Sequence, residues 1–159
     1  ILKGRLYAEK LHFIKSHFKC TLTNNFSSVE FNNLMRFLRI SNANKKELEI
    51  IKKKINIALN PINKRNECAA LSYLALCATH ELNKYPLSIH QNKSNLRQLK
   101  SYSNASFATK LVIGEKEILK NIIEFGKMSL EVLLFKRRFS PRKLKNNMKG
   151  YILLLNDME

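Results

Sequence analysis

The residues that could do chemistry are few and are scattered along the chain. Catalysis requires a nucleophile beside a base, paired carboxylates, a metal cluster or a glycine-rich loop that binds phosphate. The four glycines, Gly4, Gly114, Gly126 and Gly150, lie far apart, so no phosphate-binding loop is predicted. The twelve Asp and Glu residues are dispersed, mostly beside lysines. The sequence by itself does not describe an enzyme, and no residue is predicted to be catalytic.

Histidine and cysteine offer two further candidates. His80 and His90 flank a predicted turn and could approach each other, but no activating partner can be named. A surface or capping role is therefore the simpler interpretation of both. His17 and Cys20 are close in sequence, but no second pair with ligand spacing follows them. The pattern predicts no metal site.

Charge says more about partners than about fold. There are 29 Lys and Arg residues against 12 Asp and Glu, a formal net charge of +17. This excess predicts attraction to nucleic acid, an anionic membrane or an acidic protein surface. A simpler interpretation stays open, because a chain rich in Lys, Asn and Ile is also what an A/T-biased coding sequence would specify. Its lysines would then only solvate the surface.

Size and apolar content indicate one globular domain with a real core. The chain has 159 residues, 45% of them hydrophobic. No apolar run is long enough to span a membrane. Cys20, Cys68 and Cys77 lack paired spacing, which favours free thiols and an intracellular location, cytoplasmic or nuclear, with an organelle also open. Because the chain opens on Ile1, we expect it to be part of a longer protein.

One uninterrupted run of helical periodicity, from about residue 103 to 135, dominates the chain. At about 1.5 Å per residue it would span roughly 50 Å, and Ser103 is placed to cap its start. Apolar residues at steps of three and four predict one buried face, and lysines such as Lys116 fall on the other faces. The predicted face holds Ala108, Leu111, Ile118, Ile122, Phe125 and Val132, with Glu115 and Ser129 in two further slots.

Five shorter helices are predicted to pack along this long one. They cover residues 1–19, a segment capped by Ser27 or Ser28, residues 45–59, residues 64–84, and a segment that begins at a Ser88/Gln91 capping box. No strand pattern is present, so the predicted fold is all-α, an orthogonal or irregular multi-helix bundle around the helix at about 103–135. Residues 1–135 are predicted to form this domain and residues 136–159 a basic C-terminal tail.

Three stretches form a recognisable series: NECAALSYL from Asn66, ELNKYPLSI from Glu81 and ATKLVIGEKEILKNII from Ala108. The series resembles the C-terminal substrate-binding lobe of SET-domain methyltransferases, which is named after the Rubisco large-subunit methyltransferase and shared by the actin-histidine methyltransferase. That family typically has Asn-Glu before an Ala- and Leu-rich helix, then Tyr-Pro-Thr-Thr before an acidic cluster, then Leu-Gly-Glu-Lys-x-Ile-Leu on a long helix. The matching positions are Asn66, Glu67, Tyr85, Pro86, Gly114, Glu115, Lys116, Ile118 and Leu119.

The sequence also departs from the family pattern. Leu87-Ser88 stands where two threonines are usual, and His90, Gln91 and Asn92 replace the acidic cluster. Upstream, FNNLMRFLRISNANKKELE is similar to the early helices of the lobe, so the likeness covers roughly residues 5 to 135.

The resemblance implies a non-catalytic lobe of a protein-lysine methyltransferase. In the family, catalysis belongs to a SET domain N-terminal to the lobe, which binds S-adenosylmethionine through an Asn-His pair and uses a tyrosine near its end. Neither the Asn-His pair nor its flanking sequence occurs in this chain, so the chain itself is predicted to bind no cofactor. Its expected partners are its own upstream SET domain and a protein substrate, possibly an acidic one.

The matching residues are interpreted as scaffold. Asn66 and Glu67 fall in the first turn of a helix, Tyr85-Pro86 anchors a turn, and Gly114 is expected at a close helix crossing. Substrate contacts are assigned on charge alone to the basic faces, represented by Arg97, Lys100 and Lys110.

Two other functions compete with the substrate-binding lobe. One is a basic helical RNA-binding or organellar ribosomal module, in which Lys and Arg contact phosphates and Tyr7, Tyr102 or Tyr151 stacks on bases. The other is a purely structural adaptor. A SET domain encoded upstream of Ile1 would favour the methyltransferase hypothesis, whereas RNA binding that weakens steeply with salt would favour the second.

Overall fold

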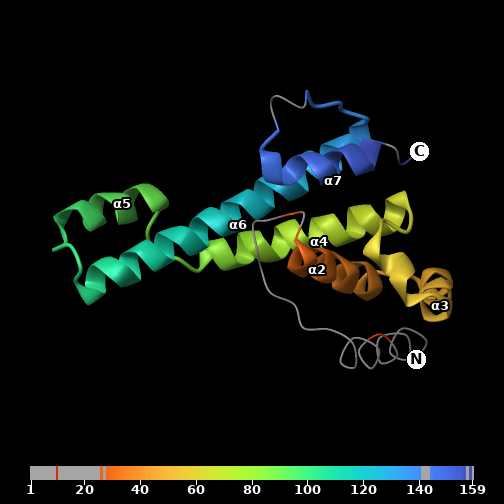
Figure 1. Ribbon diagram of the computed structural model, residues 1–159, viewed down its shortest axis with the longest axis horizontal. Coiled ribbons are helices and arrows are strands. Elements are labelled where there is room, and N and C mark those ends of the chain that lie inside the picture. The colour runs from red at the N-terminus through yellow and green to blue at the C-terminus, as the bar shows by residue number, and fades with distance from the viewer. Residues whose placement is uncertain (1–9, 11–25, 27, 141–143, 157, 159) are drawn as a thin grey trace.

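The computed structural model describes residues 10, 26, 28–140, 144–156 and 158, and in these residues it contains helices and no strand (Figure 1). This confirms the all-α fold class. The helices are α2 (Val29–Ser41), α3 (Lys45–Lys53), the 3-10 helix η1 (Ile55–Leu59), α4 (Lys64–Asn83), α5 (Ile89–Gln98), α6 (Asn104–Phe135) and α7 (Asn146–Asn156). The helix predicted over residues 1–19 and most of the loop after it lie outside the described residues.

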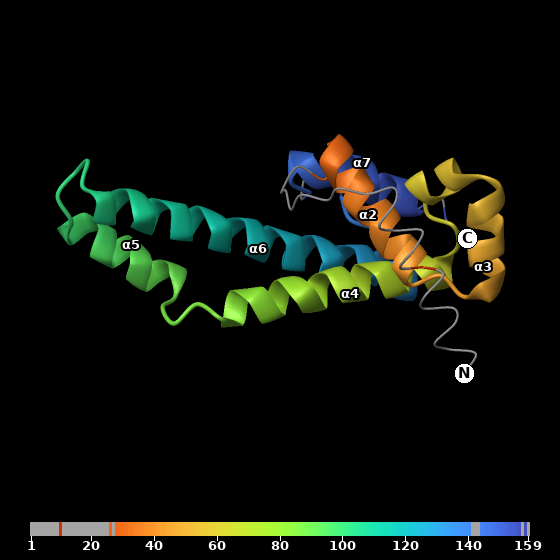
Figure 2. The ribbon, with the colours of Figure 1, turned by 90° about the horizontal axis from the view of Figure 1, so that it is seen from below.

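The predicted long helix is α6, with 32 residues. The side chain of Ser103 caps it by accepting from the backbone N–H of Ser106, as predicted. Helix α4 runs antiparallel along the C-terminal part of α6, with α2 and α7 packed around that end (Figures 1 and 2). Helix α5 folds back along the N-terminal part, so the α5–α6 hairpin projects from the bundle as an arm.

The main core lies where α2, α4, α6 and α7 meet, and aromatic rings fill its centre. The ring of Phe125 stacks on Phe26, with centroids 4.2 Å apart and planes inclined by 14°. It also meets the rings of Phe31 and Tyr151 edge to face, at 5.2 and 5.0 Å. Stacked and edge-to-face pairs at such distances are favourable beyond the area they bury. Phe125 therefore joins three separate parts of the chain.

The predicted buried face of α6 is correct only in its C-terminal half. Ile122, Phe125, Ser129 and Val132 are buried there, against α4 and α7. In the N-terminal half the prediction is wrong, since Ala108 is exposed and the side chain of Leu111 is 66% exposed. The buried residues in that half are instead Ser106, Ile113, Lys116 and Leu119. The face changes because α4 ends before it reaches this part of α6, and α5 packs on a different side.

The two central glycines of α6 have opposite surroundings. A Cβ atom added to Gly126 would lie 3.0 Å from Cβ of Ala75, so α4 and α6 approach closely at this point. A Cβ added to Gly114 would meet nothing within 4 Å. The expectation of a close helix crossing at Gly114 is therefore wrong, and the crossing lies further along α6, at Gly126.

Replacing Gly114 by Ala is expected to stabilise the fold by about 0.5–1 kcal/mol, because glycine in a helix interior is less favourable than alanine by that amount. Gly126→Ala should stabilise it less, since the new methyl group must displace Ala75. Urea unfolding of both variants measures the difference. An equal or larger gain at Gly126 would contradict the assigned crossing.

The helix predicted over residues 45–59 is also interrupted. Helix α3 ends at Lys53, Lys54 has non-helical torsion angles (φ −146°, ψ 88°), and the chain continues as η1. The tighter turn has a structural use, because the backbone carbonyls of Ala58 and Leu59 accept hydrogen bonds from the guanidinium of Arg39. Carbonyls at the end of a helix have no partner within that helix, and Arg39 supplies one here.

Residues after 135, expected as a basic tail, contain α7. Its buried side chains are Met148, Tyr151, Ile152 and Leu155, all part of the main core. The stretch before α7 keeps exposed cations, including Lys136, Arg137 and Arg138. The division of the chain at residue 135 stays a prediction.

Candidate functional site

Two of the matching residues, Asn66 and Glu67, lie in the first turn of α4 and are fully buried. They are placed by Asn63, whose side chain caps α4 by accepting from the backbone N–H of Asn66. The carboxylate of Glu67 faces Arg39 from α2, which is only 1% exposed. Nε of Arg39 lies 2.6 Å from Oε2 of Glu67, and Nη2 lies 2.9 Å from Oε1. This is a bidentate, buried ion pair.

Two further groups complete this buried ion pair. The hydroxyl of Tyr151 on α7 donates to Glu67 and accepts from Nη2 of Arg39 at 2.9 Å. Nη1 of Arg39 donates to the carbonyls of Ala58 and Leu59, at 3.1 and 2.8 Å. A buried ion pair persists when its remaining donors and acceptors are satisfied. The cluster thereby ties α2, η1, α4 and α7 together, and its chemistry is structural.

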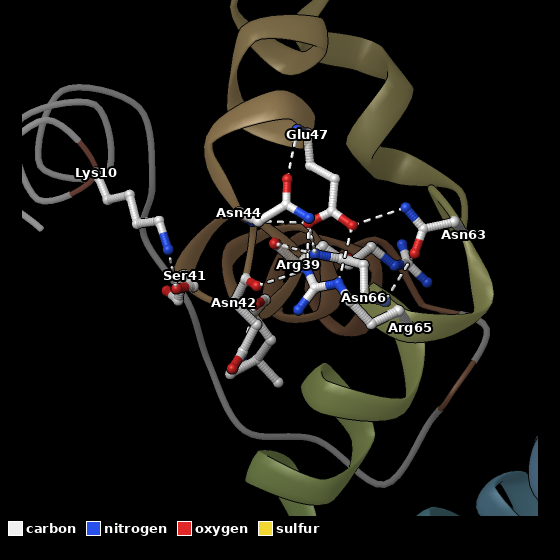
Figure 3. A network of polar contacts seen from close by, with 10 residues as sticks. Lys10, Arg39, Ser41, Asn42, Asn44, Glu47, Asn63, Arg65 and Asn66 are labelled. Atoms are coloured by element: carbon white, nitrogen blue, oxygen red, sulfur yellow. Dashed lines mark hydrogen bonds and ion pairs between the residues drawn. The ribbon is translucent and has the colours of Figure 1, made fainter. Parts of the chain in front are cut away.

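A second polar cluster centres on Glu47 in the first turn of α3 (Figure 3). Its carboxylate accepts from the backbone N–H of Asn44 at 2.7 Å, from Nδ2 of Asn63 at 2.7 Å and from Nε of Arg65 at 3.1 Å. Nδ2 of Asn66 donates to the backbone carbonyl of Arg39 at 2.9 Å and to Oε2 of Glu47 at 3.4 Å, and so links the two clusters. Burial favours the neutral acid, but the hydrogen bonds from Arg65, Asn63 and Asn44 outweigh it and lower the pKa of Glu47.

Because the pKa of Glu47 is lower in the folded chain than its ordinary value of 4.5, its ionised form stabilises the fold above that pH. The stabilisation is lost as the pH falls through the lowered folded pKa. The free energy of unfolding of the native chain should therefore exceed that of Glu47→Gln at neutral pH, and the gap should narrow in acid. Urea unfolding at several pH values measures this. Glu49→Gln, which removes only an exposed pair with Lys52, serves as control. A gap for Glu47→Gln that stayed constant into acid would contradict the assignment.

The remaining matching residues meet where α4 gives way to α5. Lys116 is predicted on a solvent face but is 2% exposed. Its ammonium donates to the backbone carbonyl of Leu87 at 2.6 Å and to Oδ1 of Asn92. It also lies 4.8 Å from the centroid of the Tyr85 ring, a cation–π contact. Lys116 thus fixes the Tyr85-Pro86 turn and the start of α5 on α6.

The sequence pattern predicts Glu115 on the buried side of α6, but the structure places it on the exposed side. The hydroxyl of Tyr85 donates to Oε2 of Glu115 at 2.8 Å. This hydrogen bond raises the pKa of Tyr85, and desolvation acts in the same direction. An open pocket of about 310 Å³ adjoins the pair, lined by Glu81, Tyr85, Glu115, Ile118 and Leu119.

The three candidate substrate-binding residues lie apart from these clusters. Arg97 is in the last turn of α5, Lys100 follows that helix, and Lys110 is in the second turn of α6; all three are exposed. They gather at the far end of the arm, and none contacts the buried ion pair. The matching residues therefore form the scaffold, and Arg97, Lys100 and Lys110 form an exposed basic surface on the arm.

Sequence reasoning missed several residues of the clusters. Arg39 and Glu47 were not singled out, and Asn92 was named only as a departure from the family's acidic cluster. Tyr151 was offered as a base-stacking residue, although it is only 8% exposed. The one usable signal was Arg39 itself, a charge inside the apolar run FLRI.

Among the described residues no group of three His, Cys, Asp or Glu could hold a metal ion. In the same residues, no helix is long and apolar enough to cross a membrane.

The fold and these clusters define an all-α domain with a projecting arm. A family model described as Rubisco LSMT substrate-binding matches residues 3–119, and the chain belongs to this family of methyltransferase substrate-binding domains. The matched region includes the Arg39–Glu67 ion pair, the Glu47 cluster and Lys116 with its contacts. Tyr151 lies outside it. None of the curated proteins and none of the solved structures that were compared matches the chain.

Proposed function

We propose that this chain binds a protein substrate for a SET-domain protein-lysine methyltransferase and presents it to an upstream, S-adenosylmethionine-dependent SET domain. The observation that carries the proposal is the family match over residues 3–119. The structure supports a binding role because Asn66, Glu67 and Lys116 make buried contacts that hold α2, α4, α5 and α6 in place. Such a rigid scaffold can present a surface.

The same proposal includes the character of the substrate. Arg97, Lys100 and Lys110 are exposed at the end of the arm, and the chain as a whole carries a charge of +17. Complementary charge speeds encounter and selects partners more than it adds affinity. We therefore propose that the arm favours a substrate with an acidic segment near its docking site.

A basic RNA-binding module remains the second candidate, favoured by the net charge and by Tyr102, which is 85% exposed at the arm's tip. Tyr151 no longer supports it, because its hydroxyl and ring are buried. Tyr7 lies outside the described residues.

The coding sequence upstream of Ile1 separates the two candidates. Under the methyltransferase proposal it encodes a SET domain with its Asn-His pair and terminal tyrosine. A titration of the chain with single-stranded RNA at increasing salt is the companion measurement. Absence of a SET domain, together with RNA affinity that falls steeply with salt, would overturn the proposal in favour of the second candidate.

A further inference from the structure

Part of α6 extends beyond the helix that covers the rest of it. Helix α4 lies along the C-terminal part of α6 and ends at Asn83, while α5 packs on another side of the N-terminal part (Figure 1). The contacts with α5 bury Ile113 and Lys116. By helical spacing, the side of α6 that carries Phe125 and Val132 continues into the N-terminal part, where it is left uncovered and Phe107 and Leu111 are exposed.

That uncovered side carries four residues at helical spacing, Phe107, Leu111, Gly114 and Ile118, which we call the distal stripe. Phe107 is 52% exposed and Leu111 is 66% exposed, and Ile118 is partly buried. The space above Gly114 is open, because a Cβ added there would meet nothing within 4 Å. The stripe is therefore an exposed apolar row with open space above Gly114, and the pocket beside Ile118 adjoins its inner end.

The charge differs between the two ends of the stripe. Residues 82–114 contain no Asp or Glu, and their cations are Lys84, Lys93, Arg97, Lys100 and Lys110. Lys84 pairs with Glu81 and Lys93 pairs with Glu117, and Glu81 and Glu115 line the pocket at the inner end. Lys110 borders the outer end directly, since its Nζ lies 5.6 Å from the centroid of the Phe107 ring. An apolar strip with cations at its outer end is complementary to a partner with apolar and acidic faces.

We propose that the distal stripe is the docking site for an acidic amphipathic helix of a partner protein. The partner's apolar residues contact Phe107 and Leu111 and fill the open space above Gly114. Its carboxylates face Lys110, Arg97 and Lys100. The proposal rests on the proposed function, because it names the substrate class that the domain receives. Helix-in-groove recognition of this kind uses apolar anchors at steps of three and four.

Two other occupants fit less well. A second copy of the chain would bring its own positive arm against this one, and like charges repel. RNA fits less well because the stripe is apolar and the exposed Leu111 offers no aromatic face for a base.

The test uses the complete chain and a fluorescent synthetic helix with leucines on one face and glutamates on the other. Binding is followed by anisotropy. The double variant Phe107→Ser/Leu111→Ser should weaken binding about tenfold or more, as loss of apolar anchors does. Lys110→Glu should weaken it and flatten its salt dependence. Matched controls are Leu76→Ser on α4, whose side chain is also 66% exposed, and Lys127→Glu in the C-terminal half of α6. Both should bind as the native chain does.

The proposal is overturned if the acidic helix does not bind, or if the control variants lose as much affinity as the stripe variants. It is also overturned if a lysine-containing version of the helix or single-stranded RNA binds more tightly than the acidic helix. Self-association of the chain that Leu111→Ser abolishes in sedimentation would overturn it as well. Circular dichroism of each variant confirms that it is folded. If the acidic helix does not bind but methyl transfer still depends on the domain, the docking proposal fails and the proposed function stands. The two proposals can therefore fail separately.

Discussion

Replacing Glu67 by Gln is expected to destabilise the folded chain by roughly 3–5 kcal/mol, the usual cost of leaving one charge of a buried pair uncompensated. The guanidinium of Arg39 would keep its hydrogen bonds to Ala58, Leu59 and Tyr151 but would lose its only described carboxylate. Water cannot replace that carboxylate, since Arg39 and Glu67 are 1% and 0% exposed. Urea unfolding followed by circular dichroism measures the change.

The matched control is the exposed pair between Arg137 and Glu131, with Nη1 and Oε2 2.6 Å apart. Breaking it with Glu131→Gln should cost less than about 1 kcal/mol, because exposed pairs gain little over hydration. A double-mutant cycle with Arg39→Met then isolates the buried pair, whose two single losses should sum to more than the loss in the double variant. Additive losses would show that Arg39 and Glu67 do not act on each other.

Replacing Phe125 by Ala should also destabilise the fold by about 3–5 kcal/mol, the range for removing a buried aromatic ring. Phe125 is fully buried and touches the rings of Phe26, Phe31 and Tyr151. The cavity would open between α2, α6 and α7, so the effect should include loss of near-ultraviolet circular dichroism. Urea unfolding gives the energy.

Phe135 at the end of α6 provides the control for this loss. Its side chain is 76% exposed, so Phe135→Ala removes the same ring with little change in burial. Its effect should stay within about 0.5 kcal/mol, as for most surface substitutions. Similar losses at Phe125 and Phe135 would mean that the aromatic cluster is not the centre of the core.

Helix existence and helix starts were predictable because they depend on neighbouring residues. Ser103, Asn63 and the Ser88/Gln91 capping box each act within one turn, and all three cap helices in the structure. The buried face of α6 was predictable only where α4 covers it. Periodicity indicates that an apolar face exists, but it does not state how far a neighbouring helix extends, and so Leu111 was assigned to the core.

The buried charges were not predictable for a related reason. A pattern of polar and apolar residues places every lysine and arginine in water, and only a specific partner overrides it. The partners of Arg39 lie 28 and 112 residues away in Glu67 and Tyr151, and Asn92 lies 24 residues from Lys116. Resemblance to a family identified Glu67 and Lys116 as scaffold, but it did not name the groups that they bind.

The central claim is that this domain binds the protein substrate of a methyltransferase. The most direct measurement is the steady-state kinetics of methyl transfer by a SET-domain protein that carries this chain, compared with the same SET domain alone. Removing the domain should raise KM for the protein substrate about tenfold or more, with the affinity for S-adenosylmethionine unchanged as evidence that the SET domain is folded. An unchanged KM for the protein substrate would contradict the account.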